Sequence, residues 1–162
     1  GIDYENPNRQ SIPNFKEYFA TYDDKLKLRL HQTIHFELGR SIVGQCGSLI
    51  SKVLYVKQGA KKQCAILDAG MTELIRPALY QAYHKIENLS SEELVQAYYV
   101  VGPICESSDV FGISIDLNKV SRGDFIAIRS AGAYGEVMAS QYNRRELPKP
   151  YVSDDFDSCD IK

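Results

Sequence analysis

The hydrophobic pattern of this sequence changes once, near residue 45, from a helical period to the period of β-strands. After that point, short apolar runs rich in Val, Ile and Tyr alternate with turn residues, as is typical of strands. These runs are 48–56, 63–67, 97–101, 112–115 and 125–128. The first two flank a Gly-Ala-Lys-Lys turn and predict a hairpin. Short strands with frequent turns indicate a mainly β fold, an antiparallel β-barrel or β-sandwich.

The first 44 residues have a different pattern. Apolar residues between Pro13 and Leu26 recur at helical spacing, and the proline stands near the expected start of the helix. The run 34–38 then predicts a short strand. A helix followed by a strand is one unit of an α/β layer, and its apolar face needs upstream partners or an oligomer. We therefore divide the chain into an incomplete α/β-barrel piece at 1–44 and a β domain at 45–162.

Composition and charge argue against two classes of partner. The chain of 162 residues has a formal net charge of -2 and no run of Lys or Arg longer than two. This charge pattern is unlike that of proteins whose primary partner is nucleic acid. No apolar stretch approaches the roughly 20 residues that span a bilayer, so no membrane association is expected. No signal-peptide pattern opens the sequence.

The four cysteines form no CxxC pair and have no metal-ligand spacing with the histidines. A chain of this length can build a core without disulfides, so reduced thiols in a cytoplasmic compartment are expected. Cys46 and Cys64 lie in apolar runs and are expected to pack as small buried hydrophobes. His31 and His35 are four residues apart, but the residues between them favour a strand, so no helical metal pair is expected.

The segment GPICESSD at 102–109 places a thiol, Cys105, beside a carboxylate, Glu106, directly after a predicted strand. Gly, Pro and Ser commonly mark turns, so a purely structural turn is one interpretation. The other is that a rigid strand delivers Cys-Glu into a loop and presents a proton donor and a charged anchor together. These residues alone leave both interpretations open.

Two further segments carry candidate ligand-binding groups. In ELGR at 37–40, the glycine permits close backbone approach to a ligand, and Arg40 offers a planar fork for phosphate or carboxylate. In AGAYG, glycines bracket Tyr134, which indicates a phenol held in a tight turn. The alternatives are a strand end with a surface arginine and a tyrosine that only packs.

A third segment, RPALY at 76–80, places Arg76 four residues before Tyr80. Pro77 disfavours the helical conformation at the residue before it, so an irregular loop is predicted here. Arg76 and Tyr80 are candidate binding residues, and a solvated loop with a packed tyrosine is the alternative.

Taken together, these segments resemble the pyridoxal-phosphate-dependent diaminopimelate decarboxylases, in the alanine-racemase-like group that includes ornithine and arginine decarboxylases. Members of that family carry Glu-Pro-Gly-Arg where this sequence has ELGR. They also carry versions of three further elements of this sequence, which are DAGM…RPALY (68–80), GPxCES-x-D (102–109) and AGAYG…MAS-x-YN (131–143). GIDY at 1–4 is similar to the sequence after the family's triple-glycine phosphate loop. RPALY together with CES-x-D points to the diaminopimelate branch.

The resemblance implies a fold, a reaction and a set of roles. The fold is a C-terminal β domain preceded by the last helix–strand piece of a (β/α)8 barrel. The reaction converts meso-2,6-diaminopimelate to L-lysine and CO2 with pyridoxal 5'-phosphate, and Cys105 would protonate the carbanion. The implied cofactor-binding residues are Glu37, Gly39, Arg40 and Tyr134. The implied substrate-binding residues are Arg40, Arg76, Tyr80, Glu106 and Tyr134.

The sequence departs from the family at two points. Leu38 replaces the family's proline in the phosphate-binding segment. The family's Schiff-base lysine lies in an N-terminal portion, and no lysine here has a matching context. The chain is therefore interpreted as the substrate-recognition and dimerisation part of the enzyme, inactive alone. Because the family's Cys-Glu loop comes from the neighbouring subunit, a homodimer with shared sites is implied. A decarboxylase of arginine or ornithine and a non-catalytic binding or regulatory relative are the alternatives.

Overall fold

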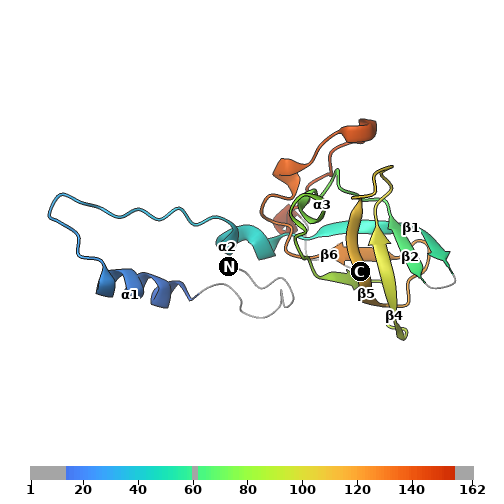
Figure 1. Ribbon diagram of the computed structural model, residues 1–162, viewed down its shortest axis with the longest axis horizontal. Coiled ribbons are helices and arrows are strands. Elements are labelled where there is room, and N and C mark those ends of the chain that lie inside the picture. The colour runs from blue at the N-terminus through green and yellow to red at the C-terminus, as the bar shows by residue number, and fades with distance from the viewer. Residues whose placement is uncertain (1–13, 60–61, 156–162) are drawn as a thin grey trace.

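The computed structural model describes residues 14–59 and 62–155, and a strongly curved sheet dominates it (Figure 1). The helices are α1 (Phe15–Lys25), α2 (Arg40–Val43) and α3 (Arg76–Tyr80). The strands are β1 (Leu49–Gln58), β2 (Gln63–Leu67), β3 (Ile86–Asn88), β4 (Val95–Val101), β5 (Val110–Asn118) and β6 (Phe125–Ile128). Short 3-10 helices are η1 (Gly44–Cys46), η2 (Glu136–Met138), η3 (Tyr142–Arg144) and η4 (Ser153–Asp155). The GIDY segment lies outside the described residues.

The six strands form one sheet in the order β3-β6-β1-β2-β4-β5. All neighbours are antiparallel except β2 and β4, which pair in parallel. The first half of β1 pairs with β6 and the second half with β2, with an irregularity in the β1–β2 register between Val53 and Tyr55. Bulges of this kind bend a strand. The edge strands β3 and β5 also contact each other, so the sheet is a nearly closed barrel.

The barrel interior is filled by alternate side chains from the strands. Leu67, Ile126 and Ile128 are fully buried in it. Tyr98 is also buried, and its hydroxyl donates to Gln96 Oε1 and accepts the Val120 N–H, each at 3.0 Å. The phenol is therefore satisfied inside an apolar core, as buried tyrosines usually are.

Most strand predictions are confirmed, including the hairpin of β1 and β2. The predicted mainly β, barrel-like fold is confirmed, with one parallel pair that the antiparallel prediction did not include. The short β3 was missed, and β5 extends on both sides of the predicted 112–115.

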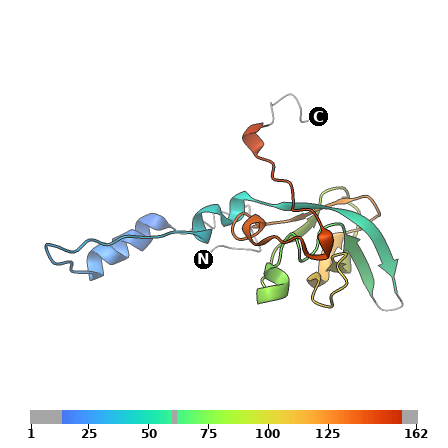
Figure 2. The ribbon, with the colours of Figure 1, turned by 90° about the horizontal axis from the view of Figure 1, so that it is seen from above.

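The helix predicted after Pro13 is confirmed as α1, but the strand predicted at 34–38 is wrong, because those residues have no regular structure. A strand needs a neighbour for its N–H and C=O groups, and no described segment pairs with this one. Its Phe36 ring instead packs edge-on against Phe19 and Tyr22, with centroids 4.8 and 4.9 Å apart. Both views show this unit projecting from the barrel (Figures 1 and 2).

Three further predictions need correction. RPALY is the short helix α3 and not an irregular loop, because Pro77 lies in the first turn, where its missing N–H is not needed. Cys46 is exposed and donates through Sγ to the Val43 carbonyl at 2.9 Å. Cys64 is half-buried, since it lies on the face of β2 opposite to the buried Ala65. None of the described helices is both long and apolar enough to cross a bilayer.

Glu87 on β3 provides a test of how β3 is held beside β6. Its Oε1 pairs with Lys85 Nζ and its Oε2 with Arg129 Nε, each at 2.6 Å. Burial opposes its charge, but the hydrogen bonds from Lys85 and Arg129 outweigh this and lower the pKa of Glu87 below 4.5. A carboxylate with a lowered pKa stabilises the fold above its ordinary pKa, and this stabilisation is lost as the pH falls through the folded-state pKa.

We expect Glu87→Gln to lower the free energy of unfolding by about 1 kcal/mol at pH 7, after allowance for solvent screening. The difference from the wild type should shrink as the pH falls below about 4. Urea unfolding at several pH values measures this. The control is Glu93→Gln, which breaks an exposed pair with Lys119 and should have a smaller effect. An effect of Glu87→Gln that is the same at pH 7 and pH 3 would contradict the linkage.

Candidate active site

Gly39, Arg40 and Tyr134 meet at the start of α2. The Arg40 guanidinium lies 5.5 Å from the centre of the Tyr134 ring. A Cβ atom placed on Gly39 would lie 3.6 Å from the Tyr134 hydroxyl. A cation, a phenol and accessible backbone therefore face one space, although Tyr134 is far from Gly39 and Arg40 in the sequence. Both side chains are exposed, so a ligand can reach them.

The loop that carries Tyr134 is fastened to the turn after α2. Ala131 N–H donates to the Gly47 carbonyl at 2.9 Å, and Gly132 N–H donates to the Gly44 carbonyl at 3.0 Å. A Cβ atom on Gly132 would come within 2.2 Å of the Val43 carbonyl oxygen, so only glycine fits there. Tyr134 itself has a positive φ of 61°, a conformation that side chains other than glycine adopt rarely. Close packing of two loops thus fixes the phenol.

Arg76 begins α3 and is buried, with 5% of its surface exposed. Its guanidinium lies 5.7 Å from the centre of the Tyr80 ring, and Tyr80 itself is exposed. Among the described residues, no carboxylate forms a salt bridge with Arg76, and its buried Nε has no hydrogen-bond partner. A buried cation without a counter-charge is costly. An anionic ligand group would therefore be bound favourably beside Arg76.

His84 is a buried histidine whose protonation is opposed by both arginines. Its Nδ1 lies 2.9 Å from the Arg129 carbonyl, and the ring is buried. Burial lowers the pKa of His84, and the charges of Arg76 and Arg40 lower it further against the opposing effect of the carbonyl. The imidazole is therefore neutral at pH 7 and leaves the positive charge of this region to the two guanidinium groups.

Cys105 and Glu106 lie on the loop between β4 and β5, and both side chains are exposed. The Tyr142 hydroxyl donates to Glu106 Oε1 at 2.6 Å. Glu106 and Tyr142 also line a small pocket of about 200 Å³, together with residues just before α3, among them Ile75. No hydrogen bond or ring contact joins this loop to Arg40 or Tyr134 in the part of the chain that the structure describes.

Asp109 is a buried residue whose role the sequence did not reveal. Its two carboxylate oxygens accept the Met71 N–H at 2.6 Å and the Ile104 N–H at 2.7 Å. Burial raises the pKa of Asp109, although these two backbone hydrogen bonds oppose the change. Asp109 thus ties the Cys105 loop to the loop before α3. The glycines in both motifs were a signal, because Gly70 and Gly102 leave room for this carboxylate.

Glu73 and Arg145 form a second connection that was missed. Glu73 is buried and accepts the Gly70 N–H at 2.6 Å and the Arg145 Nε–H at 3.0 Å. Arg145 also donates to the Asp68 carbonyl. The ion pair fastens the C-terminal segment onto the loop before α3. No sequence pattern indicated this pair.

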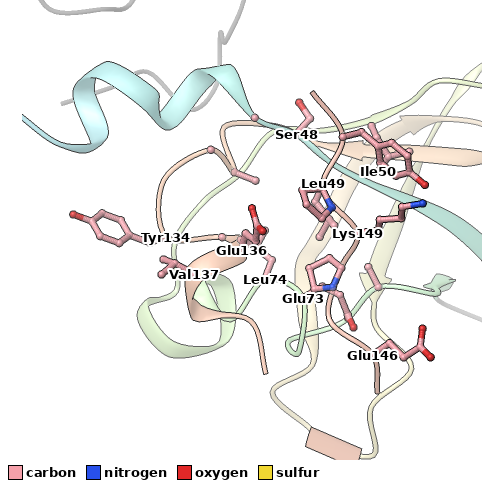
Figure 3. Close-up of a pocket in the computed structure, with 18 of the residues that line it drawn as sticks. Ser48, Leu49, Ile50, Glu73, Leu74, Tyr134, Glu136, Val137, Glu146 and Lys149 are labelled. Atoms are coloured by element: carbon pink, nitrogen blue, oxygen red, sulfur yellow. The ribbon is translucent and has the colours of Figure 1, made fainter. Parts of the chain in front are cut away.

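A larger groove of about 780 Å³ is lined in part by both residues of this ion pair (Figure 3). Tyr134 is at its wall, whereas Arg76, Cys105 and Glu106 do not line it. Figure 3 shows the Tyr134 ring pointing away from Leu49, Ile50 and Lys149. The phenol hydroxyl therefore faces Gly39 and not this groove.

Residues 19–132 match the family described as "Pyridoxal-dependent decarboxylase, C-terminal sheet domain". The chain belongs to this family. The "Diaminopimelate decarboxylase" of Bacteroides thetaiotaomicron is 78% identical over 96% of the chain and 40% of its own length. The "Diaminopimelate decarboxylase" of Neisseria meningitidis is 41% identical over 90% of the chain and 34% of its own length. The chain thus spans two-fifths or less of these relatives.

Solved structures give the same result for this pyridoxal-dependent decarboxylase domain. A diaminopimelate decarboxylase mutant from Helicobacter pylori, complexed with L-lysine, superimposes with a TM-score of 0.78 at 44% identity. The match covers 90% of this chain and 35% of that one. A lysine/ornithine decarboxylase from Vibrio vulnificus, at 23% identity and a TM-score of 0.62, shares the fold.

The structure groups the predicted site residues of this decarboxylase domain in three sets. Gly39, Arg40 and Tyr134 form one set, and Arg76 and Tyr80 form another. Cys105 and Glu106 form the third, on an exposed loop. Glu37 is exposed, and it forms no hydrogen bond or ion pair with residues 14–59 or 62–155.

The contact between Gly102 and Asp109 gives a direct test of the loop geometry. A Cβ atom on Gly102 would lie 2.3 Å from the Asp109 carboxylate and 2.5 Å from Gly70 Cα. We expect Gly102→Ala to lower the free energy of unfolding by about 1–3 kcal/mol, as overpacking usually does. The control is Ser107→Ala, at an exposed position of the same loop. Equal stability of the two variants would show that the contact is not tight.

Proposed function

We propose that this chain is the substrate-recognition and dimerisation part of a diaminopimelate decarboxylase, which converts meso-2,6-diaminopimelate to L-lysine and CO2. The observation that carries the proposal is the buried guanidinium of Arg76, which has no anionic partner among residues 14–59 and 62–155. A substrate carboxylate would supply that anion through a charge-assisted, bidentate contact. The relatives named above support this substrate.

Arg76 and Tyr80 would hold the carboxylate that is distal to the reacting carbon. The Tyr80 ring lies beside the guanidinium, and the phenol is exposed, so its hydroxyl can donate to the same carboxylate. Arg40, at the start of α2, would also contact the substrate. Two cationic side chains suit a substrate with two carboxylates.

The family is pyridoxal-dependent, and the groups around Gly39 fit the phosphate of pyridoxal 5'-phosphate. The Gly39 backbone, the Arg40 guanidinium and the Tyr134 hydroxyl offer donors and a positive charge to one space. Glu37 precedes Gly39 and Arg40 on the same segment. When bound, the cofactor supplies an electron sink for the decarboxylation. The residues of this chain would bind and orient it.

Cys105 would donate its thiol proton to the carbon that has lost CO2, and Glu106 would bind the distal ammonium group. The loop is exposed, and among the described residues no hydrogen bond or ring contact joins it to Arg40 or Tyr134, which supports its use in the site of a second copy of the chain. We therefore propose a homodimer with shared sites. The described cysteines are free thiols, which supports a reducing, cytoplasmic compartment.

Replacement of Cys105 by alanine in the full-length enzyme tests the proton donor. We expect kcat to fall by about 10²-fold or more, while KM for meso-diaminopimelate changes little, because general acids act in the transition state. Steady-state kinetics measures both. The control is Cys46→Ala, which removes another exposed thiol. An unchanged kcat in Cys105→Ala would remove Cys105 from this role.

Replacement of Arg76 by lysine keeps the charge but removes the planar fork. We expect KM for meso-diaminopimelate and the inhibition constant of L-lysine to rise about tenfold, since hydrogen bonds to charged groups are lost. L-lysine retains the distal carboxylate, whereas cadaverine has no carboxylate. The inhibition constant of cadaverine should therefore not change. Equal weakening of cadaverine would show a general disturbance of the site. A wild-type preference for arginine or ornithine would support a different decarboxylase.

A further inference from the structure

We propose that Tyr142 is a positioning residue for Glu106. In this proposal, the Tyr142 hydroxyl holds one carboxylate oxygen of Glu106, so that the other oxygen is aimed at the distal ammonium group of the diamino acid. The inference rests on the proposed function, because it requires Glu106 to be the ammonium anchor. It adds a specificity-determining residue outside the set that the sequence predicted.

The hydrogen bond itself has the geometry of a strong contact. The Tyr142 oxygen lies 2.6 Å from Glu106 Oε1, within the range of about 2.5–2.7 Å for a hydroxyl that donates to a carboxylate. The structure gives Glu106 no salt bridge with a described Lys or Arg. A neutral donor therefore orients this carboxylate without cancelling its charge, which remains available for a cation.

The backbone on both sides of Tyr142 is fixed. Ser140 N–H donates to the Thr72 carbonyl at 2.9 Å, and Arg145 forms the ion pair with the buried Glu73. Both anchors are on the loop that leads into α3. Between Ser140 and Arg145, the residues Asn143 and Arg144 have positive φ angles of 56° and 58°. This conformation turns the segment sharply, and side chains other than glycine adopt it rarely.

The fixed backbone around Tyr142 is important because the Glu106 side chain is exposed. A long acidic side chain on an exposed loop has many rotamers, and ordering it on substrate binding costs conformational entropy. Tyr142 has only two side-chain torsions and reaches Glu106 beside the small pocket that both residues line. A rigid phenol that selects one carboxylate orientation reduces that entropic cost before the substrate arrives.

The proton of this hydrogen bond belongs to Tyr142. Its pKa is raised, first by the hydrogen bond to Glu106, then by the charge of Glu106, and to a smaller extent by burial and by Cys105. The phenol therefore stays protonated at neutral pH and remains the donor. Glu106 is the acceptor, and its second oxygen keeps its lone pairs for an ammonium group.

The experiment compares Tyr142→Phe, Glu106→Gln and the double variant in the full-length enzyme. We expect Tyr142→Phe to raise KM for meso-diaminopimelate about tenfold, as the loss of a hydrogen bond to a charged group does, and to leave kcat within about twofold. In the Glu106→Gln background the same change should have little further effect, because Tyr142 acts through that carboxylate. The control is Tyr55→Phe, at an exposed position of β1.

Each outcome separates the inference from the function on which it rests. If Glu106→Gln leaves KM unchanged, Glu106 is not the ammonium anchor, and both the role proposed for it and the inference fail. If Glu106→Gln raises KM but Tyr142→Phe does not, only the inference fails. If the effects of Tyr142→Phe and Glu106→Gln on KM add in the double variant, Tyr142 acts independently of Glu106, and the inference fails. Since the phenylalanine variant loses one exposed hydroxyl, its thermal unfolding midpoint should match that of Tyr55→Phe.

Discussion

Buried acceptors that bind the backbone of the loop at 68–73 hold the proposed site together. The Met71 N–H is satisfied by Asp109, the Gly70 N–H by Glu73 and the Ala69 N–H by the Ser51 hydroxyl. A buried N–H without a partner costs about 1–3 kcal/mol, so each acceptor fixes the loop strongly. Ser51 and Asp109 come from other parts of the chain, and Glu73, within the loop, pairs with Arg145. The loop is thereby joined to β1, the Cys105 loop and the C-terminal segment.

The contacts of this loop determine where the proposed binding residues lie. The loop leads directly into α3, and thus places Arg76. Asp109 ties the Cys105–Glu106 loop to the same backbone, from which it would reach the site of a second copy, and the Glu73–Arg145 pair brings Tyr142 within reach of Glu106. A disturbance of the loop backbone would therefore move several proposed binding groups together. These buried polar contacts position the loops of the proposed site beside the apolar barrel core.

Sequence reasoning succeeded where the signal was local. The alternation in β1 and β2 and the turn between them predicted their pairing correctly. It failed where tertiary contacts decide the outcome. The run 34–38 has strand-like residues but no described neighbour to pair with, and the three residues of β3 are too few for a periodic signal. Pro77 disfavours helix at the residue before it and so predicted an irregular loop, but it lies in the first turn of α3, where proline is tolerated.

The same limit applies to the site. The resemblance named the groups that would touch ligands, and the structure places Arg40 against Tyr134 and Arg76 against Tyr80. The resemblance could not reveal which residues hold these binding groups in place. Asp109 acts on Met71, and Tyr142 acts on Glu106, across long stretches of sequence that no local pattern spans. Short-range periodicity carries no information about such contacts.

The charges of the proposed site explain why a diamino diacid would be a better ligand than a simpler amino acid. Among the described residues, Arg76 has no carboxylate partner, and Glu106 accepts from a neutral phenol and not from a cation. Neither charge is neutralised within the chain, so each gains most from a ligand group of opposite sign. A ligand with only one distal charge would satisfy one of them and leave the other unpaired. Selectivity would then follow from the cost of the unpaired group as much as from the contacts that are made.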